Sequence, residues 1–142
     1  MPLADDILND LEITARPGNI PGRLVELTGP NAPAPLLNFF NYLSPRALPP
    51  LVAALRAQRG FGHNEEGYDY LAAAASEEPA TVAVYDFVGR VEMSAPAFQR
   101  LAARFLVQLV QVAAARQDAM LQQPWWEEFV QDTQALAEQA EI

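Results

Sequence analysis

The segment 63–70, HNEEGYDY, holds the only histidine of the chain together with three carboxylates and two tyrosines. His63, Glu66 and Asp69 combine imidazole and oxygen ligands, which is the chemistry of a metal site or a small acid–base centre. If the segment is helical, Glu66 and Asp69 lie three residues apart on one face. The helix dipole would also stabilise Glu65 and Glu66 in a first turn without any site. We therefore expect a solvated helix start, without metal or cofactor, that can serve as an acidic patch for a protein partner.

The rest of the chain lacks the groups that enzymes use as nucleophiles or phosphate ligands. There is no cysteine and no G-x-S-x-G motif, and the seven glycines are scattered instead of forming a phosphate-binding loop. The paired carboxylates are Glu65–Glu66, Glu77–Glu78 and Glu127–Glu128. Neighbours on a helix point about 100° apart, so these pairs do not face each other across a reacting bond. We expect a protein that is not an enzyme.

Trp125 and Trp126 are adjacent, so they cannot both face the same core. Trp126 fits the apolar stripe of the last predicted helix, which leaves Trp125 turned partly outward beside Glu127 and Glu128. An exposed tryptophan surrounded by carboxylates is typical of a hot spot for a basic protein partner. Packing of Trp125 over the long helix as peripheral core is the other interpretation, and the sequence leaves both open.

Charge is segregated along the chain, which has 18 acidic and nine basic residues and a net charge of -9. Residues 16–59 contain five arginines and one acid. Residues 60–94 contain seven acids and one arginine, and residues 118–142 contain six acids and no base. Such a field favours a cationic partner and repels nucleic acid. We expect a partner protein with a basic surface and no nucleic-acid partner.

The chain shows no targeting or membrane signal. Its longest uncharged stretch in the helical region, residues 105–115, has 11 residues, whereas a membrane span needs about 20. The N-terminus, MPLADDILNDLEI, carries aspartates where a signal peptide has an apolar segment. The absence of cysteine is consistent with a reducing compartment. We expect a cytoplasmic protein without a membrane partner.

The elements that would position these residues follow from periodicity, prolines and capping residues, and the length suits one domain over 1–142. Strands are predicted at 11–16 and 23–27. Helices are predicted at 3–10, at 34–43 after an Asn31 cap, at 51–59 between Pro50 and a stop at Gly60, and at 65–76. Residues 61–63 are predicted as a loop. Short strands and proline-punctuated helices of this kind indicate an α+β protein.

Residues 81–94 give the clearest strand signal. The run TVAVYDF alternates, which places Val82, Val84 and Asp86 on one side of a strand. Gly89 then turns the chain, and RVEMS returns as a second strand. The pattern predicts a β-hairpin over 81–94.

The helix at 95–117 is the strongest predicted element. Ser94 suits its cap and Pro96 its first turn, and apolar residues recur at intervals of three and four along it. A last helix is predicted to start at Pro124. The predicted fold is α+β: a mostly helical single domain whose small antiparallel sheet, the hairpin 81–94, packs on the long helix 95–117.

The run TVAVYDFVGRVEMSAPAFQRLAARFL, residues 81–106, consists of a hairpin followed by a serine-capped helix that opens with an aromatic residue. It resembles the small acidic immunity proteins of bacterial polymorphic toxin and secretion-linked competition systems. The resemblance implies an α+β inhibitor that plugs or covers a cognate toxin domain, and it brings no active residues with it. The charge of the chain agrees with this, because an acidic inhibitor associates quickly with a basic toxin.

We therefore predict a non-catalytic immunity protein that neutralises a cognate toxin with a basic surface. The acids of 65–92 and those of the tail, 125–141, would meet the toxin. The predicted partner-binding residues are Glu65, Glu66, Asp69, Glu77, Glu78, Trp125, Glu127 and Glu128. Two alternatives stay open. One is an acidic secretion chaperone for an effector segment, which the few predicted strands disfavour; the other is a small enzyme that uses the His63–Asp69 cluster.

Overall fold

A computed structural model of the protein describes residues 2–18, 23–63, 65–72 and 79–142. Within these ranges the chain forms five α-helices, two 3-10 helices and two antiparallel sheets, so the predicted, mostly helical α+β fold is confirmed. The helices are α1 (Asp5–Asn9), α2 (Ala34–Asn41), η1 (Pro45–Ala47), α3 (Leu48–Arg56), α4 (Ala95–Arg116), η2 (Ala119–Gln122) and α5 (Trp126–Gln139). The strands are β1 (Glu12–Ala15), β2 (Val25–Thr28), β3 (Phe61–His63), β4 (Glu66–Ala72), β5 (Pro79–Tyr85) and β6 (Arg90–Ser94). No helix in the described ranges has the length and apolar character that a membrane crossing requires.

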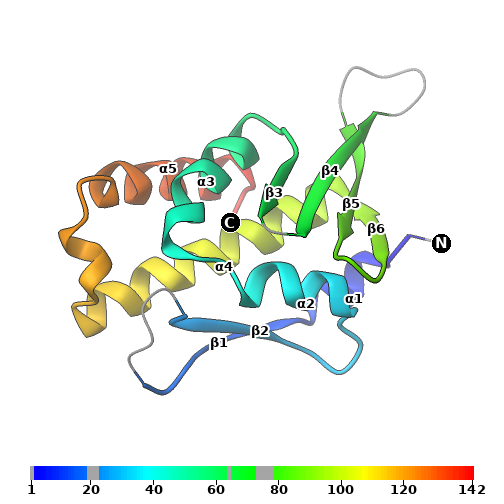
Figure 1. Ribbon diagram of the computed structural model, residues 1–142. Helices are drawn as coiled ribbons and strands as arrows, with labels where there is room; N and C mark the ends of the chain where they lie inside the picture. Colours follow the sequence, from blue (N-terminus) through cyan, green and yellow to red (C-terminus); the bar gives the residue numbers. More distant parts are fainter. Residues whose placement is uncertain (1, 19–22, 64, 73–78) are drawn as a thin grey trace.

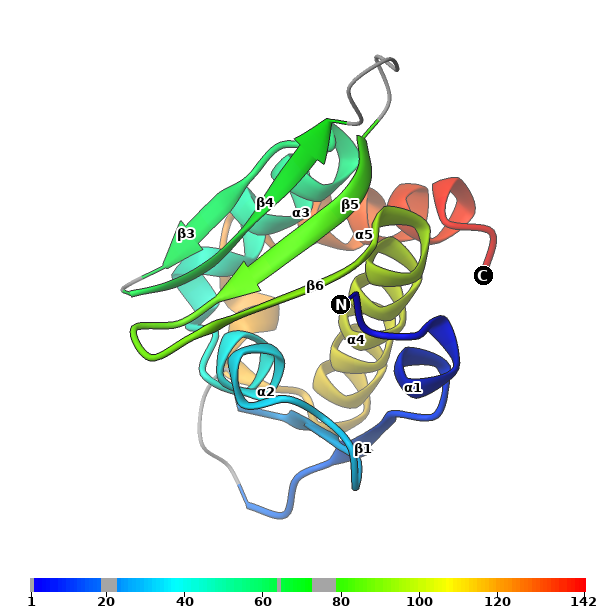
Figure 2. The same ribbon diagram turned by 90° about the vertical axis from the view of Figure 1, so that its right-hand side faces the viewer.

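The larger sheet has the strand order β3-β4-β5-β6, and all its neighbouring strands are antiparallel. The helices α2 and α4 pack on one face of this sheet, as the two views in Figures 1 and 2 show. The strands β1 and β2 form a separate ribbon against α2 and α4. The last helix, α5, packs on α3 and α4 on the side away from the sheet (Figure 1).

Aromatic side chains join the larger sheet to the helices. The ring of Tyr68 on β4 lies 5.5 Å from that of Phe39 on α2 and 4.8 Å from that of Phe98 on α4. Phe40 on α2 lies 5.0 Å from Phe105 on α4. These five side chains are at most 2% exposed. Burial of each large apolar side chain contributes about 1.5–3 kcal/mol, so the cluster fixes the sheet on α2 and α4.

The predicted hairpin and long helix are confirmed as β5, β6 and α4. Ser94 ends β6 and caps α4, because its hydroxyl accepts a hydrogen bond of 3.2 Å from the amide of Ala97. Pro96 stands in the first turn, where the helix needs no amide donor. At the other end Gln117 adopts a left-handed conformation, with a φ of 50°, and stops the helix. The other predicted elements that are present are α1, α2, α3, α5, β1 and β2.

The predicted helix at 65–76 is wrong, because residues 66–72 form strand β4. The preceding segment, predicted as a loop, forms strand β3 at Phe61–His63. The acids at the start of this segment suggested a helix, but a strand puts Tyr68 into the aromatic cluster that distant elements build. Tertiary packing of this kind overrides local propensity. The end of the predicted helix, residues 73–76, lies outside the described residues.

The surroundings of Gly67 explain why β4 has a glycine at this position. The ring of Tyr85 on β5 lies over Gly67, and a Cβ atom added there would overlap the tyrosine side chain. The same Cβ would come within 2.6 Å of the carbonyl oxygen of Phe61. Gly62, the partner of Gly67 on β3, lies under the same phenol. An aromatic ring that covers glycines on neighbouring strands is a known device for stabilising a sheet near its edge.

Two predicted helix boundaries are also wrong. Asn31 does not cap α2, which follows Pro33 without a side-chain cap. The helix α3 ends at Arg56, before Gly60, because Gln58 adopts a left-handed conformation with a φ of 53°. Neither change moves the core face of these helices, since Leu36, Phe39 and Phe40 of α2 and Leu51, Val52 and Leu55 of α3 are buried.

Candidate protein-binding site

Two turns of the larger sheet lie together at one of its ends. The chain passes from β3 to β4 between His63 and Glu66, and from β5 to β6 between Tyr85 and Arg90. Because Gly67 at the start of β4 pairs with Tyr85 at the end of β5, both turns project from the same end of the sheet. Figure 2 shows them side by side at its left edge. We call the surface formed by Glu65, Glu66 and residues 86–90 the hairpin end.

Asp86 fixes the turn between β5 and β6. Its carboxylate accepts hydrogen bonds of 2.9 Å from the amide of Val88, 2.8 Å from the amide of Gly89 and 3.0 Å from the side-chain amide of Asn38. Its own amide donates to the carbonyl oxygen of Gly89. The bonds from Val88 and from Asn38 on α2 lower the pKa of this carboxyl below its ordinary value. The turn is therefore closed on itself and tied to a helix of the core.

The tip of this turn presents two apolar side chains to solvent. Phe87 is 75% exposed and Val88 is 79% exposed. They are the two most exposed large apolar side chains among the described residues, and they are adjacent. Because the backbone of this turn is already ordered, a partner that covers Phe87 and Val88 has only their side chains left to order, so more of the contact energy is retained on binding.

The neighbouring turn between β3 and β4 carries two acidic residues. Glu65 is exposed and Glu66 is half-buried. Burial raises the pKa of Glu66; the charge of His63 acts against this rise, and the nearby Asp86 carboxylate adds to it. Arg90, the one arginine of the hairpin end, is engaged in an ion pair of 3.3 Å with Glu92. The hairpin end therefore combines an apolar tip with net negative charge.

The predicted binding residues are distributed over different parts of the molecule. Glu65 and Glu66 belong to the hairpin end, and Asp69 is exposed farther along β4. Glu77 and Glu78 lie outside the described residues. The exposed Glu127 and Glu128 lie in the first turn of α5, and Trp125 directly precedes that helix. The start of α5 is on the left in Figure 1, whereas the sheet is on the right. The two acidic segments that were predicted to meet a toxin therefore lie on separate parts of the surface.

The residues of the His63–Asp69 cluster are arranged differently in a strand than in the predicted helix. Successive strand residues point to opposite faces, so Glu66 and Asp69, three apart, are on opposite faces of the sheet. Asp69 faces away from the core, opposite to its neighbour Tyr68. Within the described ranges, no three histidine, aspartate or glutamate side chains come together as a metal ion requires. Glu66 and Asp69 therefore do not share the common face that a helix would give them.

Sequence reasoning missed the residues that dominate this site. The alternating run TVAVYDF predicts that Phe87 belongs to the first strand of the hairpin, whereas β5 ends at Tyr85 and Phe87 and Val88 form the turn. The available signal was Asp86 followed three residues later by Gly89, since aspartate at the first and glycine at the fourth position favour a tight turn. Apolar residues at the two central positions of such a turn have no core to enter.

Trp125 is half-buried and does not project from the surface. Its ring lies 6.1 Å from that of Trp126 and 5.8 Å from that of Phe129, which it meets edge to face. The interpretation as peripheral core is therefore closer to the structure than that of an exposed hot spot.

Comparison of the chain with protein-family models, with curated proteins and with solved structures found no match in any of the three.

Proposed function

We propose that this protein is a non-catalytic inhibitor of the immunity-protein type, which binds a basic toxin of its own bacterium through the hairpin end. The observation that carries the proposal is the exposure of Phe87 and Val88, 75% and 79%, on a turn that Asp86 holds in place. An exposed apolar pair with polar surroundings is typical of a protein-interaction site. A cytoplasmic location is part of this proposal.

The two kinds of group at the hairpin end have different tasks in the proposed complex. Burial of a phenylalanine or valine side chain in a partner pocket contributes about 1.5–3 kcal/mol each. The carboxylates of Glu65 and Glu66 steer a cationic partner toward the tip and raise the association rate, an effect that salt screens. Affinity at high salt would then depend on the tip, and the association rate at low salt on the acids.

The first experiment is a pull-down from the source bacterium with tagged protein at low and at high salt, followed by mass spectrometry. The wild-type chain is compared with the double variant Phe87→Ser, Val88→Ser and with the control Ile142→Ser. Ile142 is 49% exposed and lies at the C-terminus, away from the sheet in Figure 2. Since all three side chains are exposed, urea unfolding should give similar stabilities for all variants.

The proposal expects one basic partner whose recovery falls with salt. The double variant should bind the purified partner more weakly by about 2 kcal/mol or more, about 30-fold in Kd. The control Ile142→Ser should bind it as tightly as the wild type. Co-expression of the wild-type chain, but not of the double variant, should relieve the growth arrest caused by the partner. A partner that binds the double variant as tightly as the wild type would refute the assignment of the site.

A matched pair of charge reversals separates steering from global charge. Glu65→Lys and Glu127→Lys change the net charge equally, but only Glu65 lies at the hairpin end. We expect Glu65→Lys to slow association at low salt and Glu127→Lys to leave it near the wild-type rate. Equal slowing by both would mean that net charge alone attracts the partner.

A secretion chaperone is the second candidate. The sequence disfavoured it for want of strands, but the described sheet has four. A groove of about 350 Å³ between α4 and α5, lined by Val107, Val110, Val130 and Ala137 among others, offers an apolar track for an effector segment. Light scattering distinguishes the two, because a dimer that captures the N-terminal segment of a secreted effector favours the chaperone and a monomer favours the inhibitor.

A further inference from the structure

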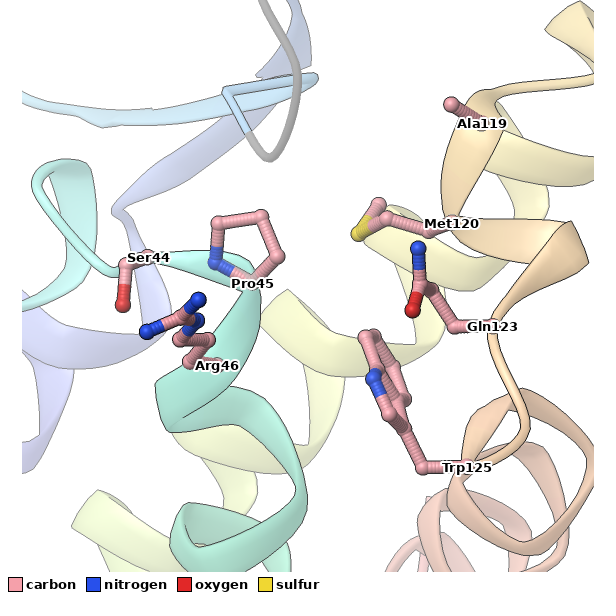
Figure 3. Close-up of a pocket in the computed structure, with 7 residues that line it drawn as sticks. All are labelled: Ser44, Pro45, Arg46, Ala119, Met120, Gln123 and Trp125. Carbon is pink, nitrogen blue, oxygen red and sulfur yellow. The ribbon is translucent and has the colours of Figure 1, made fainter.

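A hollow lies on the other side of the molecule from the hairpin end, between η1, η2 and the start of α5. It has a volume of about 430 Å³. Figure 3 shows Pro45 and Arg46 on one wall and Met120, Gln123 and Trp125 on the other. Pockets that bind small organic molecules have volumes of about 300–1,000 Å³, so the hollow has room for such a ligand.

The apolar walls of the hollow are held in place by the core. Met120 is 3% exposed. The indole of Trp125 packs against Trp126 and Phe129, with ring centroids 6.1 and 5.8 Å away. Pro45 occupies the first position of η1 and fixes the backbone of the opposite wall. A flat ligand could enter between these walls without a large rearrangement, which lowers the cost of binding.

The hollow offers three donor groups: the guanidinium of Arg46, the side-chain NH2 of Gln123 and the indole N–H of Trp125. The hydroxyl of Ser44 and the amide oxygen of Gln123 can also accept, but none of the described residues that line the hollow is acidic. In the part of the chain that the structure describes, no carboxylate forms an ion pair with Arg46. Asp118, which begins the η2 segment, is engaged, since it accepts a hydrogen bond of 3.0 Å from the amide of Met120. In a chain with twice as many acids as arginines, such a set of donors selects an anion.

We propose that this hollow binds a small carboxylic acid that carries a flat aromatic ring. The ring would lie against Trp125 and Met120, and the carboxylate would meet the fork of Arg46. Arginine matches a carboxylate with two parallel hydrogen bonds. An aromatic ligand also gains from contact with an indole face and from the methionine sulfur. This site is separate from the hairpin end and does not depend on the proposed inhibitor function.

The test uses the full chain and three probes of one shape: 2-naphthoate, 2-naphthamide and 2-naphthylmethylamine. The chain has two tryptophans, so a proton–nitrogen correlation spectrum contains two indole signals. Trp125→Phe identifies the signal of Trp125, and titration follows its shift. Arg46→Gln tests the anion contact, with Arg90→Gln as the control that makes the same change in net charge at the hairpin end.

We expect a saturable shift of the Trp125 signal with 2-naphthoate, a weaker response to the amide and none to the amine. Arg46→Gln should weaken 2-naphthoate about tenfold, the loss expected for one hydrogen bond to a charged group, and Arg90→Gln should have no effect. Arg46→Lys, which keeps the charge without the fork, should fall in between. Absence of a saturable shift at millimolar 2-naphthoate, equal binding of acid and amide, or unchanged binding to Arg46→Gln would each overturn the proposal.

Discussion

The same substitution at two neighbouring tyrosines of β4 should change stability in opposite directions. Tyr68 is fully buried, and its hydroxyl finds no hydrogen-bond partner among the described residues. Tyr70 points to the same face of the sheet, but its hydroxyl donates a hydrogen bond of 2.5 Å to the side-chain oxygen of Gln99. Burial raises the pKa of both phenols, which therefore stay protonated in the folded protein. Tyr68→Phe and Tyr70→Phe remove the same atom from these two environments.

The expected magnitudes follow from the state of each hydroxyl. A buried polar group without a partner costs about 1–3 kcal/mol, so Tyr68→Phe should raise the free energy of unfolding by about 1 kcal/mol once the lost contacts of the oxygen are subtracted. Tyr70→Phe should lower it by about 1–2 kcal/mol. It breaks one hydrogen bond and leaves the side-chain oxygen of Gln99 unsatisfied, although the amide of Gln99 still donates to the carbonyl of Leu55.

Urea unfolding measures both effects. With a slope of about 2 kcal/mol per molar urea, the midpoint should rise by about 0.5 M for Tyr68→Phe and fall by about 0.5–1 M for Tyr70→Phe, with the slope unchanged. The comparison controls itself, because the two substitutions are chemically identical and two residues apart. Destabilisation of equal size by both would refute the reasoning, since it would mean that the hydroxyl of Tyr68 is hydrogen-bonded in solution.

Three further predictions concern backbone fit, capping and acid stability. Gly67→Ala should destabilise the fold by about 1–3 kcal/mol, because the new Cβ overlaps Tyr85. Gly89→Ala should be close to neutral, because its Cβ meets no atom within 4 Å. Equal urea midpoints for the two variants would contradict this. Ser94→Ala should cost about 1 kcal/mol through loss of the α4 cap, and an unchanged thermal midpoint would argue against the cap. Because the folded pKa of Asp86 is lowered below its ordinary value of 3.8, its contribution to stability is complete above that value and is lost as the pH falls through the folded pKa. Asp86→Asn should remove this component from a pH series of urea midpoints, and an identical acid limb in both proteins would show that Asp86 does not contribute.

Local signals were sufficient where several of them agreed. In 81–94 the alternation, the turn glycine and the following cap all predict the same structure, and the structure confirms β5, β6 and the start of α4. Asp86 was placed on the side of Val82 and Val84, and it is indeed 8% exposed beside these fully buried valines. Consistency among independent local signals is what makes such a segment predictable.

The strand β4 shows why the rest could not be predicted. Its helix-like signals, two glutamates and a run of alanines, are local, whereas the reasons for a strand are not. Tyr68 is drawn into contact with Phe39 and Phe98, and Gly67 is covered by Tyr85. The two candidate sites could not be predicted from the sequence for the same reason. The spacing of residues along the sequence does not indicate that the two turns lie together at the hairpin end, or that η1 lies close to η2.

The fold places the acidic segments of the chain on separate parts of the surface. The acids of the sheet and those at the start of α5 are on different sides of the molecule (Figure 1), and the hollow that contains Arg46 lies beside the start of α5. At physiological ionic strength exposed charges act over about 8 Å, so the two sides are electrostatically independent. Salt should therefore weaken the binding of a basic partner only by screening the charges of the hairpin end. For the same reason saturation of the hollow with 2-naphthoate should leave capture of that partner unchanged. Competition between the two would require a conformational coupling across the core, which the tightly packed aromatic cluster between sheet and helices does not favour.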